Sequence, residues 1–396
     1  MMKILIITPY IGSSYGGTSR AVTELVKGLV TLGIGIDLIT TNANHLNRLD
    51  VIIDTWIVRK NHRIKYFPCW YHNDFIVSPA LINWLFKNVK NYNLVHTHTI
   101  FSPLMSLSHW ACKYNKIPYV MTPHGMLEPW ALSYKASKKY FYYSMFEKSA
   151  LQKATAVQVL ASSEAQQLQS LGFQHSVVVP NGIHRSEFAT LPKPEIFYQK
   201  YPETREKKLI LFLGRIDPKK GLNLLAPAFA KVKNQFPQTH LIVAGPDNIG
   251  FLATVKNYFK QVGCLDSVTF TGMLQGSIKQ AALAAANLYV APSYSEGFSM
   301  SVLEGMASEL PCVITTGCNF PEAATAKAVS EVDINSDAIA DALIEFLVNP
   351  QKAKKIGERA RYFIFQNYTW EKAAKKLSQV YNNILLEQEA HELCLP

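Results

Sequence analysis

The feature that most constrains this chain is a repeated alternation of short apolar runs with helical segments. Runs rich in Val, Ile and Leu occur at 3–8, 35–41, 94–98, 118–123, 156–162 and 176–182, and again at 209–214, 240–245, 267–272, 287–292 and 311–315. Strands that are apolar throughout are buried on both faces, and the helices between them serve as crossovers. The pattern therefore predicts an α/β chain with two doubly wound, Rossmann-like domains, each built on a parallel sheet.

A polar, proline-containing segment interrupts this alternation. Residues 184–208 have neither a helical nor a strand period, so they are predicted to link a first domain over 1–183 to a second over 209–369. A final helical pattern at about 370–390 follows the last strand, and it need not stay in the second domain. The length of 396 residues agrees with two domains that face a central cleft.

The charge of the chain favours an anionic partner. The formal net charge is +11, and residues 1–190 hold 18 Lys and Arg against 9 Asp and Glu, a net of +9. This excess suits nucleic acid, phosphorylated small molecules or an acidic membrane surface. The six cysteines have no C-x-x-C or zinc spacing, and the opening residues predict a strand instead of a signal peptide. No apolar run is long enough to span a bilayer, so a cytoplasmic protein is expected.

A glycine-bearing loop follows the first predicted strand. The segment GSSYGGTSR at 12–20 leads into a helix, so Gly16 and Gly17 leave backbone N–H groups at the positive end of that helix. An anion site is one interpretation, and an ordinary turn between strand and helix is the other. The glycines do not have the G-x-G-x-x-G spacing, which argues against a nicotinamide dinucleotide site.

The second domain has a comparable loop in FLGRIDPKKG at 212–221. Arg215 and Lys220 follow a strand, at the edge where open α/β sheets bind ligands. The alternative is that both are solvated loop cations.

Two glutamates frame the stretch EGFSMSVLE at 296–304. Glu296 follows a predicted strand, and its carboxylate can accept hydrogen bonds from vicinal sugar hydroxyls. The N–H groups after it lead into a helix N-terminus that suits a phosphate; they belong to Gly297, Phe298, Ser299 and Met300. Glu304 also has a structural explanation, because Ser301-x-x-Glu304 matches a capping box.

Histidines mark the carboxyl ends of two strands in the first domain. Pro123 and Gly125 flank His124 and indicate an unusual backbone, so we expect His124 to be functional. His96 and His98 are expected to be packing or hydrogen-bonding residues, because two ligands on one strand face are a weak basis for a metal site.

As a set, these motifs resemble the retaining glycosyltransferases of family four, which have the GT-B fold. EGFSMSVLE is similar to their E-x7-E motif, GRIDPKKG to their diphosphate-binding arginine and lysine, and YGGTSR to their first-domain glycine loop. VPNGI at 179–183 resembles their interdomain link, and TPHGMLEPWAL at 122–132 resembles a segment of polysaccharide-assembly members. The resemblance covers nearly the whole chain in order. It departs at His184, where the usual link has an acidic residue.

The resemblance implies a metal-independent hexosyltransferase that acts in polysaccharide or glycolipid assembly. Glu296 would bind the donor sugar, Glu304 the ribose, and Arg215 and Lys220 the diphosphate, while His124 would lie near the reacting sugar. The donor would be a UDP- or GDP-sugar, and the acceptor a saccharide or a lipid-linked molecule. No D-x-D pair is placed to bind a metal, so cations and helix termini would stabilise the departing diphosphate. The family suggests substitution on the front face of the sugar, with the diphosphate assisting the acceptor.

A basic, aromatic segment at 134–154 indicates where an acceptor could be met. Aromatic residues are interleaved there with five lysines, Lys135, Lys138, Lys139, Lys148 and Lys153. This composition suits a helix that lies on an anionic membrane surface. Such a protein would be peripheral on the inner face of the membrane. The alternative is a core helix whose lysines are solvated.

Two other functions remain open at this stage. A nucleotide-sugar epimerase would share the architecture. A nucleic-acid-binding protein would account for the basic charge, but the chain has no recognised nucleic-acid module, so no nucleic-acid partner is expected.

Overall fold

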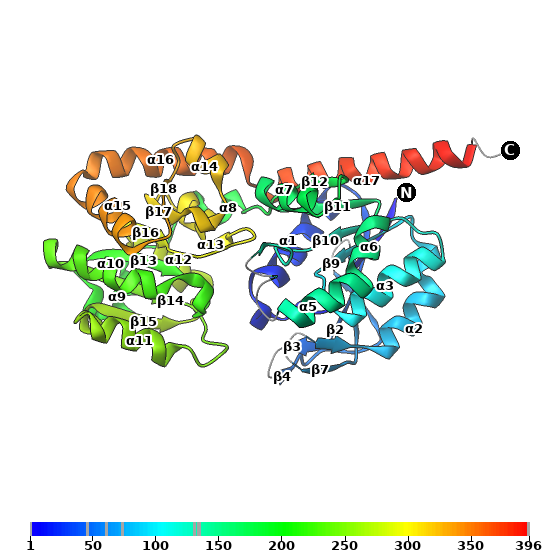
Figure 1. Cartoon of the computed structure of the whole chain (residues 1–396), viewed down its shortest axis with the longest axis horizontal. Helices are drawn as coiled ribbons and strands as arrows, with labels where there is room; N and C mark the ends of the chain where they lie inside the picture. Colours follow the sequence, from blue (N-terminus) through cyan, green and yellow to red (C-terminus); the bar gives the residue numbers. More distant parts are fainter. Residues whose placement is uncertain are drawn as a thin grey trace. The chain divides into compact units, whose positions relative to one another are not determined.

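The computed structural model describes residues 2–44, 47–59, 62–72, 75–129, 132 and 136–393. The chain forms two compact units, Met1–Asn181 with Trp370–Pro396, and Gly182–Thr369 (Figure 1). Each unit is built on its own sheet of mainly parallel strands, as the sequence predicts.

The first unit contains an eight-stranded sheet in the order β12-β11-β10-β9-β1-β2-β6-β5. Its strands run parallel except at one edge, where β5 and β6 are antiparallel. The strands of this sheet are β1 (Lys3–Ile7), β2 (Gly35–Thr41), β5 (Trp56–Arg59), β6 (His62–Phe67), β9 (Leu94–His98), β10 (Tyr119–Thr122), β11 (Ala156–Val159) and β12 (Ser176–Val178). Two small hairpins pair β3 (Ala43–Asn44) with β4 (Asn47–Arg48) and β7 (Trp70–His72) with β8 (Phe75–Val77).

Most helices of the first unit connect consecutive strands of this sheet, and α17 (Trp370–Leu393) comes from the end of the chain. The helices are α1 (Gly17–Thr31), α2 (Pro79–Asn88), α3 (Pro103–Tyr114), α5 (Ala136–Tyr142), α6 (Lys148–Lys153), α7 (Ser162–Ser170) and α17, and a π-helical turn (Tyr143–Glu147) joins α5 to α6. Local signals set several of their ends: α2, for example, begins after Ser78, whose hydroxyl accepts the N–H of Leu81, with Pro79 in the first turn.

The second unit contains a six-stranded sheet in the order β15-β14-β13-β16-β17-β18, with parallel neighbours throughout. Its strands are β13 (Lys208–Leu213), β14 (Thr239–Ala244), β15 (Val268–Gly272), β16 (Leu288–Ala291), β17 (Cys312–Thr315) and β18 (Ser330–Val332). Its helices are α8 (Arg185–Ala189), α9 (Glu195–Lys200), α10 (Leu222–Gln235), α11 (Leu252–Gln261), α12 (Gly276–Ala285), α13 (Met300–Ala307), α14 (Pro321–Thr325), α15 (Ser336–Val348) and α16 (Pro350–Asn367).

Both sheets reverse their strand order at one point. In the first sheet, β1 lies between β2 and β9, and in the second, β13 lies between β14 and β16. Crossovers leave such a point in opposite directions, so ligands of open α/β sheets bind beside the carboxyl ends of the two strands that flank it. The loops after β1, β9, β13 and β16 are therefore the places where the fold favours a site.

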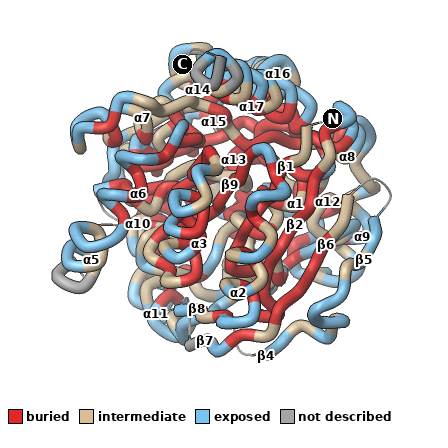
Figure 2. Tube along the Cα trace, turned by 90° about the vertical axis from the view of Figure 1, so that its right-hand side faces the viewer, coloured by how far each residue is buried: buried red, intermediate tan, exposed pale blue. Residues whose placement is uncertain are grey.

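The strands are buried because helices cover both faces of each sheet. In Figure 2 the strands are mostly red, whereas the outward sides of the helices are blue. Ile4, Leu5, Ile6 and Ile7 of β1, for example, are completely buried. This double coverage explains why the strands have continuous apolar sequences.

The last helix, α17, belongs to the first unit and is drawn in red in Figure 1. It packs against α1 at Gly28, where an added Cβ atom would lie only 2.9 Å from the Cβ atom of Ala374. Trp370 and Tyr381 are buried there. None of the helices formed by the described residues is long and apolar enough to cross a membrane.

The predicted linker at 184–208 is where the structure differs most from the sequence-based domain boundaries. This segment forms α8 and α9 inside the second unit, and the chain passes between the units after Asn181 and again after Thr369. Phe188 and Phe197 lie in the core of the second unit. Their wide spacing gives no periodic signal, so the sequence conceals their burial.

Candidate active site

The loops after β13, β16 and β17 are joined at the carboxyl edge of the second sheet. The N–H of Tyr294 donates to the carbonyl of Lys219 at 2.8 Å, which ties the β16 loop to the β13 loop. The N–H of Glu296 donates to the carbonyl of Gly317 at 2.7 Å, and the side-chain amide of Asn319 donates to the carbonyl of Glu296 at 2.7 Å. Glu296 is therefore held by its backbone from both sides.

Two glycines allow these loops to approach each other. A Cβ atom at Gly221, where φ is 70°, would lie 1.8 Å from the carbonyl oxygen of Pro292. A Cβ atom at Gly317 would lie 2.3 Å from the carbonyl oxygen of Ser293. Real Cβ contacts are not that short, so only glycine permits this backbone packing.

Glu296 and Lys220 form an ion pair at the centre of this network. Lys220 Nζ lies 2.5 Å from Glu296 Oε1, and the hydroxyl of Ser293 donates to the same oxygen at 2.6 Å. Burial would raise the pKa of Glu296, but the charges of Lys220 and Lys219 and these hydrogen bonds outweigh it and lower that pKa. Glu296 is thus a buried carboxylate that stays ionised.

The other cations of this loop differ in their surroundings. Burial lowers the pKa of Lys219, which lies close enough to Glu296 to feel its charge. Arg215 is exposed and makes no hydrogen bond or ion pair with the described residues. Of the two predicted diphosphate ligands, Lys220 has a partner within the protein, whereas Arg215 is open to a ligand.

Helix α13 begins two residues earlier than the capping box requires. Its N-cap residue is Ser299, and Ser301 lies inside the first turn, so the capping-box interpretation of Glu304 is wrong. The Glu304 carboxylate instead accepts a hydrogen bond from Lys279 Nζ of α12 at 2.7 Å. No side chain caps the first N–H groups of α13, which leaves the start of this helix suited to an anion.

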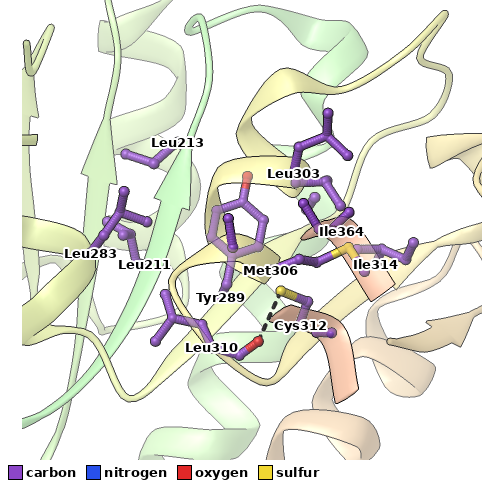
Figure 3. Close-up of a cluster of buried hydrophobic side chains, with 14 of the residues drawn as sticks. Leu211, Leu213, Leu283, Tyr289, Leu303, Met306, Leu310, Cys312, Ile314 and Ile364 are labelled. Atoms are coloured by element: carbon purple, nitrogen blue, oxygen red, sulfur yellow. Dashed lines mark hydrogen bonds between the residues drawn. The ribbon is translucent and has the colours of Figure 1, made fainter. Parts of the chain in front are cut away.

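Helix α13 packs into a dense apolar cluster (Figure 3). The ring of Tyr289 from β16 lies beside α13, and an added Cβ atom at Gly305 would lie 2.8 Å from that ring. Leu303, Met306 and Cys312 complete this part of the core, and all three are fully buried. The packing fixes how closely α13 approaches the sheet, and so fixes the position of Glu304.

In the first unit, Gly16 and Gly17 lie between β1 and α1 as predicted. Gly16 has φ of 72° and is the N-cap of α1, again without a side-chain cap. A Cβ atom at either position would meet no described protein atom within 4 Å. Packing within the described part of the protein therefore explains neither glycine, and the positive φ explains only Gly16.

His124 occupies a left-handed backbone turn after β10. Its φ is 55° and that of Gly125 is 73°. The carboxylate of Glu164 accepts the N–H of Gly125 at 2.7 Å and the N–H of Leu160 at 2.9 Å, which fixes the turn against α7. Burial raises the pKa of Glu164 to about 7.

A chain of imidazoles extends to α17 from His124, which is partly buried, through His98 and His96, which are fully buried. Nε2 of His124 lies 3.0 Å from Nδ1 of His98, and the rings of His98 and His96 are 4.3 Å apart. His96 bonds to the hydroxyl of Tyr381 at 2.5 Å and to that of Thr122 at 2.7 Å. Burial lowers the pKa of His124 to about 4 and that of His96 to about 3, so these rings are neutral at pH 7.

The predicted site residues thus fall into two groups, one in each unit. The second unit brings together Arg215, Lys220, Glu296, Gly297, Phe298, Ser299, Met300 and Glu304, and the first unit holds Gly16, Gly17 and His124. Sequence reasoning missed residues that complete these groups: Lys219, Lys279, Ser293, Asn319 and Glu164. Lys219 could have been noticed beside Lys220, but the others carry no local signal. Among the described residues, no group of His, Cys, Asp and Glu side chains is arranged to hold a metal ion.

Comparison with known proteins agrees with this geometry. Residues 15–187 match the family described as Glycosyltransferase Family 4, and residues 195–363 match Glycosyl transferases group 1. The chain belongs to the group 1 glycosyltransferases of family four. The family resemblance expected from the motifs is therefore confirmed, and the enzyme class with it.

Among the relatives of this glycosyltransferase is a phosphatidyl-myo-inositol mannosyltransferase of Mycobacterium leprae, 25% identical over 97% of both chains. An alpha-monoglucosyldiacylglycerol synthase of Streptococcus pneumoniae is 28% identical over 79% of this chain and 70% of its own. The structure of a sucrose-phosphate synthase from Thermosynechococcus elongatus superposes with a TM-score of 0.78 at 22% identity, over 97% of this chain and 100% of the other. Anabaena HepE in complex with UDP and glucose superposes with a TM-score of 0.76 at 15% identity, over 97% and 100%. These likenesses confirm the GT-B fold.

Replacing Lys220 by Gln should destabilise the second unit, because it leaves Glu296 buried without its closest cation. Breaking one side of a buried ion pair costs about 3–5 kcal/mol, and we expect about 3 because Lys219 stays nearby. The melting temperature of the variant measures this. Lys231→Gln, which breaks the exposed pair with Asp337, is the control and should leave the melting temperature nearly unchanged. Equal melting temperatures for Lys220→Gln and the wild type would contradict the assignment.

Acid should loosen the first unit through its buried histidines. The pKa values of His96, His98, His109 and His124 are lowered by burial, so below pH 6.5 these four side chains bind more protons in the unfolded chain than in the folded chain. Glu147 and Glu164, whose pKa burial raises to about 7, act in the opposite direction, but they are two groups against four. Stability then falls as the pH decreases towards about 4, by up to about 1.4 kcal/mol per pH unit for each histidine.

Hydrogen exchange at pH 7.5 and pH 5.5, corrected for the intrinsic rate, tests this. Peptides from β9, β10 and α17 should lose protection, and peptides from β16 and α13, which contain no histidine, are the internal comparison. A uniform loss of protection in both units would speak against the histidine explanation.

Proposed function

We propose that this glycosyltransferase moves a hexose from a nucleoside-diphosphate sugar, UDP- or GDP-linked, to an acceptor hydroxyl with retention of the anomeric configuration. The observation that carries this proposal is the loop network of the second unit. It combines an ionised, buried Glu296, the neighbouring Lys219 and Lys220, an exposed Arg215 in the loop after β13, and the uncapped start of α13. Cations suit a diphosphate, and a fixed carboxylate suits sugar hydroxyls.

The contacts of Glu296 support its role as the sugar-binding carboxylate. Lys220 and Ser293 both donate to Oε1 of Glu296. The other oxygen, Oε2, accepts no hydrogen bond from the described residues. That oxygen can accept hydrogen bonds from two sugar hydroxyls without breaking the pair that keeps the carboxylate ionised. Glu304, held by Lys279, would bind the ribose in the same manner.

The departing diphosphate would be stabilised by protein charges. Arg215 offers an unengaged guanidinium, Lys219 and Lys220 add positive potential, and the first N–H groups of α13 from Met300 onward add the helix dipole. On this proposal catalysis needs no metal ion. The acceptor would attack on the face that the diphosphate leaves, which retains the configuration.

The acceptor would bind the first unit, near Gly16, Gly17 and His124. The relatives named above include enzymes named for phosphatidyl-myo-inositol and for diacylglycerol. These names support a lipid-linked acceptor, with a saccharide as the alternative, and they support a role in glycolipid or polysaccharide assembly.

Exposed aromatic side chains on the first unit support a peripheral membrane position. Tyr140 and Phe141 of α5 are 75% and 64% exposed, and Met145 of the π-helical turn is 57% exposed. The hydroxyl of Tyr142 bonds to that of Ser106 on α3, a helix whose exposed side carries Leu107, Trp110 and Tyr114. We call these exposed residues of α3, α5 and the π-helical turn the aromatic face. Basic and aromatic side chains together suit an anionic bilayer.

The predicted lysines of this segment are only partly described. Lys135 lies outside the described residues, as does the side chain of Lys138. Lys148 is exposed, and the ammonium of Lys139 lies 5.7 Å from the ring of Phe101. The core-helix alternative does not account for the exposed rings of the aromatic face.

Substitutions at Glu296 and Glu304 should have different effects on binding of the donor sugar and binding of the nucleotide. A thermal-shift screen against UDP- and GDP-sugars first identifies the donor, since a ligand of the native state raises its melting temperature. Calorimetry should then show that Glu296→Gln weakens binding of the sugar nucleotide by about tenfold or more but hardly affects the nucleoside diphosphate. Glu304→Gln should weaken both ligands.

Equal effects of Glu296→Gln on the two ligands would contradict these roles. Exposed Glu358→Gln in α16 is the matched control and should leave both affinities unchanged. Incubation of the donor without acceptor tests the epimerase alternative, because an epimerase would produce a new sugar stereoisomer.

Membrane binding should depend on the charge beside the aromatic face. We expect the protein to sediment with vesicles that contain anionic lipid and to be released as the salt concentration rises, because each lysine near the surface contributes about 1 kcal/mol. Replacing Lys139, Lys148 and Lys153 by Glu should abolish sedimentation. The same change at Lys207, Lys256 and Lys260 of the second unit is the control. Equal binding to neutral vesicles, or equal loss in both triple variants, would disprove this surface.

A further inference from the structure

His98 and His124 share one hydrogen bond, and the groups around it determine which of the two rings is the donor. Nδ1 of His98 and Nε2 of His124 are 3.0 Å apart, so one ring donates and the other accepts. Both rings are neutral at pH 7, because burial lowers the pKa of each. If His124 donated, His98 would carry its own proton on Nε2. If His98 donates, its Nε2 carries only a lone pair.

The far nitrogen of His98 distinguishes these two arrangements. Nε2 of His98 is buried and has no hydrogen-bond partner among the described residues. The neighbouring ring of His96 cannot serve as that partner, because both of its nitrogens are engaged by Tyr381 and Thr122. A buried N–H without a partner is rarer than an acceptor that lacks one. The arrangement with a bare lone pair on His98 Nε2 is therefore the favoured one.

We propose that His98 is a positioning residue that donates its Nδ1–H to Nε2 of His124 and so keeps the proton of His124 on Nδ1. That nitrogen has no hydrogen-bond partner among the described residues, so it would present an N–H donor to an oxygen of the acceptor bound to the first unit. This use of the donor rests on the proposed glycosyl transfer. A neutral ring suits a hydroxyl or ring oxygen better than it suits a phosphate, and it orients the substrate without protonating it.

The surrounding backbone is built to hold His98 and His124 in this relation. Thr99 and Phe101, directly after His98, have φ values of 76° and 58°, so the chain turns sharply where β9 ends. β9 flanks the reversal of strand order in the first sheet, and β10, which His124 follows, is its neighbour. Left-handed residues of this kind persist where surrounding structure imposes them, and they are frequent at functional sites.

Nitrogen-15 NMR of the histidine-labelled, full-length protein tests the tautomer without any substrate. The signals of His124, assigned by their loss in His124→Asn, should show a protonated Nδ1 and a bare Nε2. In His98→Leu, the preference of His124 for the tautomer protonated on Nδ1 should disappear, because the Nδ1–H donor of His98 has been removed. A wild-type His124 protonated on Nε2, or an unchanged tautomer in His98→Leu, would overturn the proposal. Because this measurement involves no transfer, it separates failure of the tautomer from failure of the proposed function.

Substitutions that imitate one ring nitrogen add a kinetic test. The amide nitrogen of Asn occupies about the place of Nδ1, and that of Gln about the place of Nε2. We expect His98→Leu and His98→Gln to lower kcat about tenfold while the affinity for the nucleoside diphosphate stays unchanged, and His98→Asn to restore most of the rate. Melting temperatures verify that the variants fold. Equal rates for the Asn and Gln variants would contradict a role for Nδ1–H.

Discussion

The ion pair between Lys220 and Glu296 is the interaction on which the second unit's site depends. It connects the loops after β13 and β16, the two strands that flank the reversal of strand order. A carboxylate as buried as Glu296 would lose its charge without a cation close by. The cation reaches it because Gly221 lets the β13 loop lie against Pro292. A backbone contact that only glycine permits thus sets the ionisation of the side chain proposed to hold the sugar.

The two units use the same position in the fold for different chemistry. In each, a glycine loop and candidate residues follow the strands at which the order of the sheet reverses; in the first unit, His124 follows β10, the neighbour of β9. The second unit gathers charges, as a diphosphate requires. In the first unit, burial keeps His98 and His124 neutral, which suits hydrogen bonding to hydroxyls. This division agrees with a donor bound by the second unit and an acceptor bound by the first.

The strands and the loops that follow them could be predicted from the sequence, because continuous apolar runs and glycines are local signals. Partners distant along the chain could not: nothing near Glu304 indicates Lys279, and nothing near Gly125 indicates Glu164. The capping-box interpretation failed because the pattern fits Ser301 while the helix begins at Met300. Strand β6 was missed because charged residues alternate with apolar ones in it, although Lys65 is buried there.

The central claim is that protein cations, without a metal ion, hold the diphosphate at the loops after β13 and β16. Calorimetric titration of the donor's nucleoside diphosphate in the presence of EDTA tests it most directly. The wild type should bind under these conditions, and Arg215→Ala should weaken binding by about 100-fold, equivalent to about 3 kcal/mol. Binding that appears only when magnesium is added, or an Arg215→Ala variant with wild-type affinity, would contradict the account.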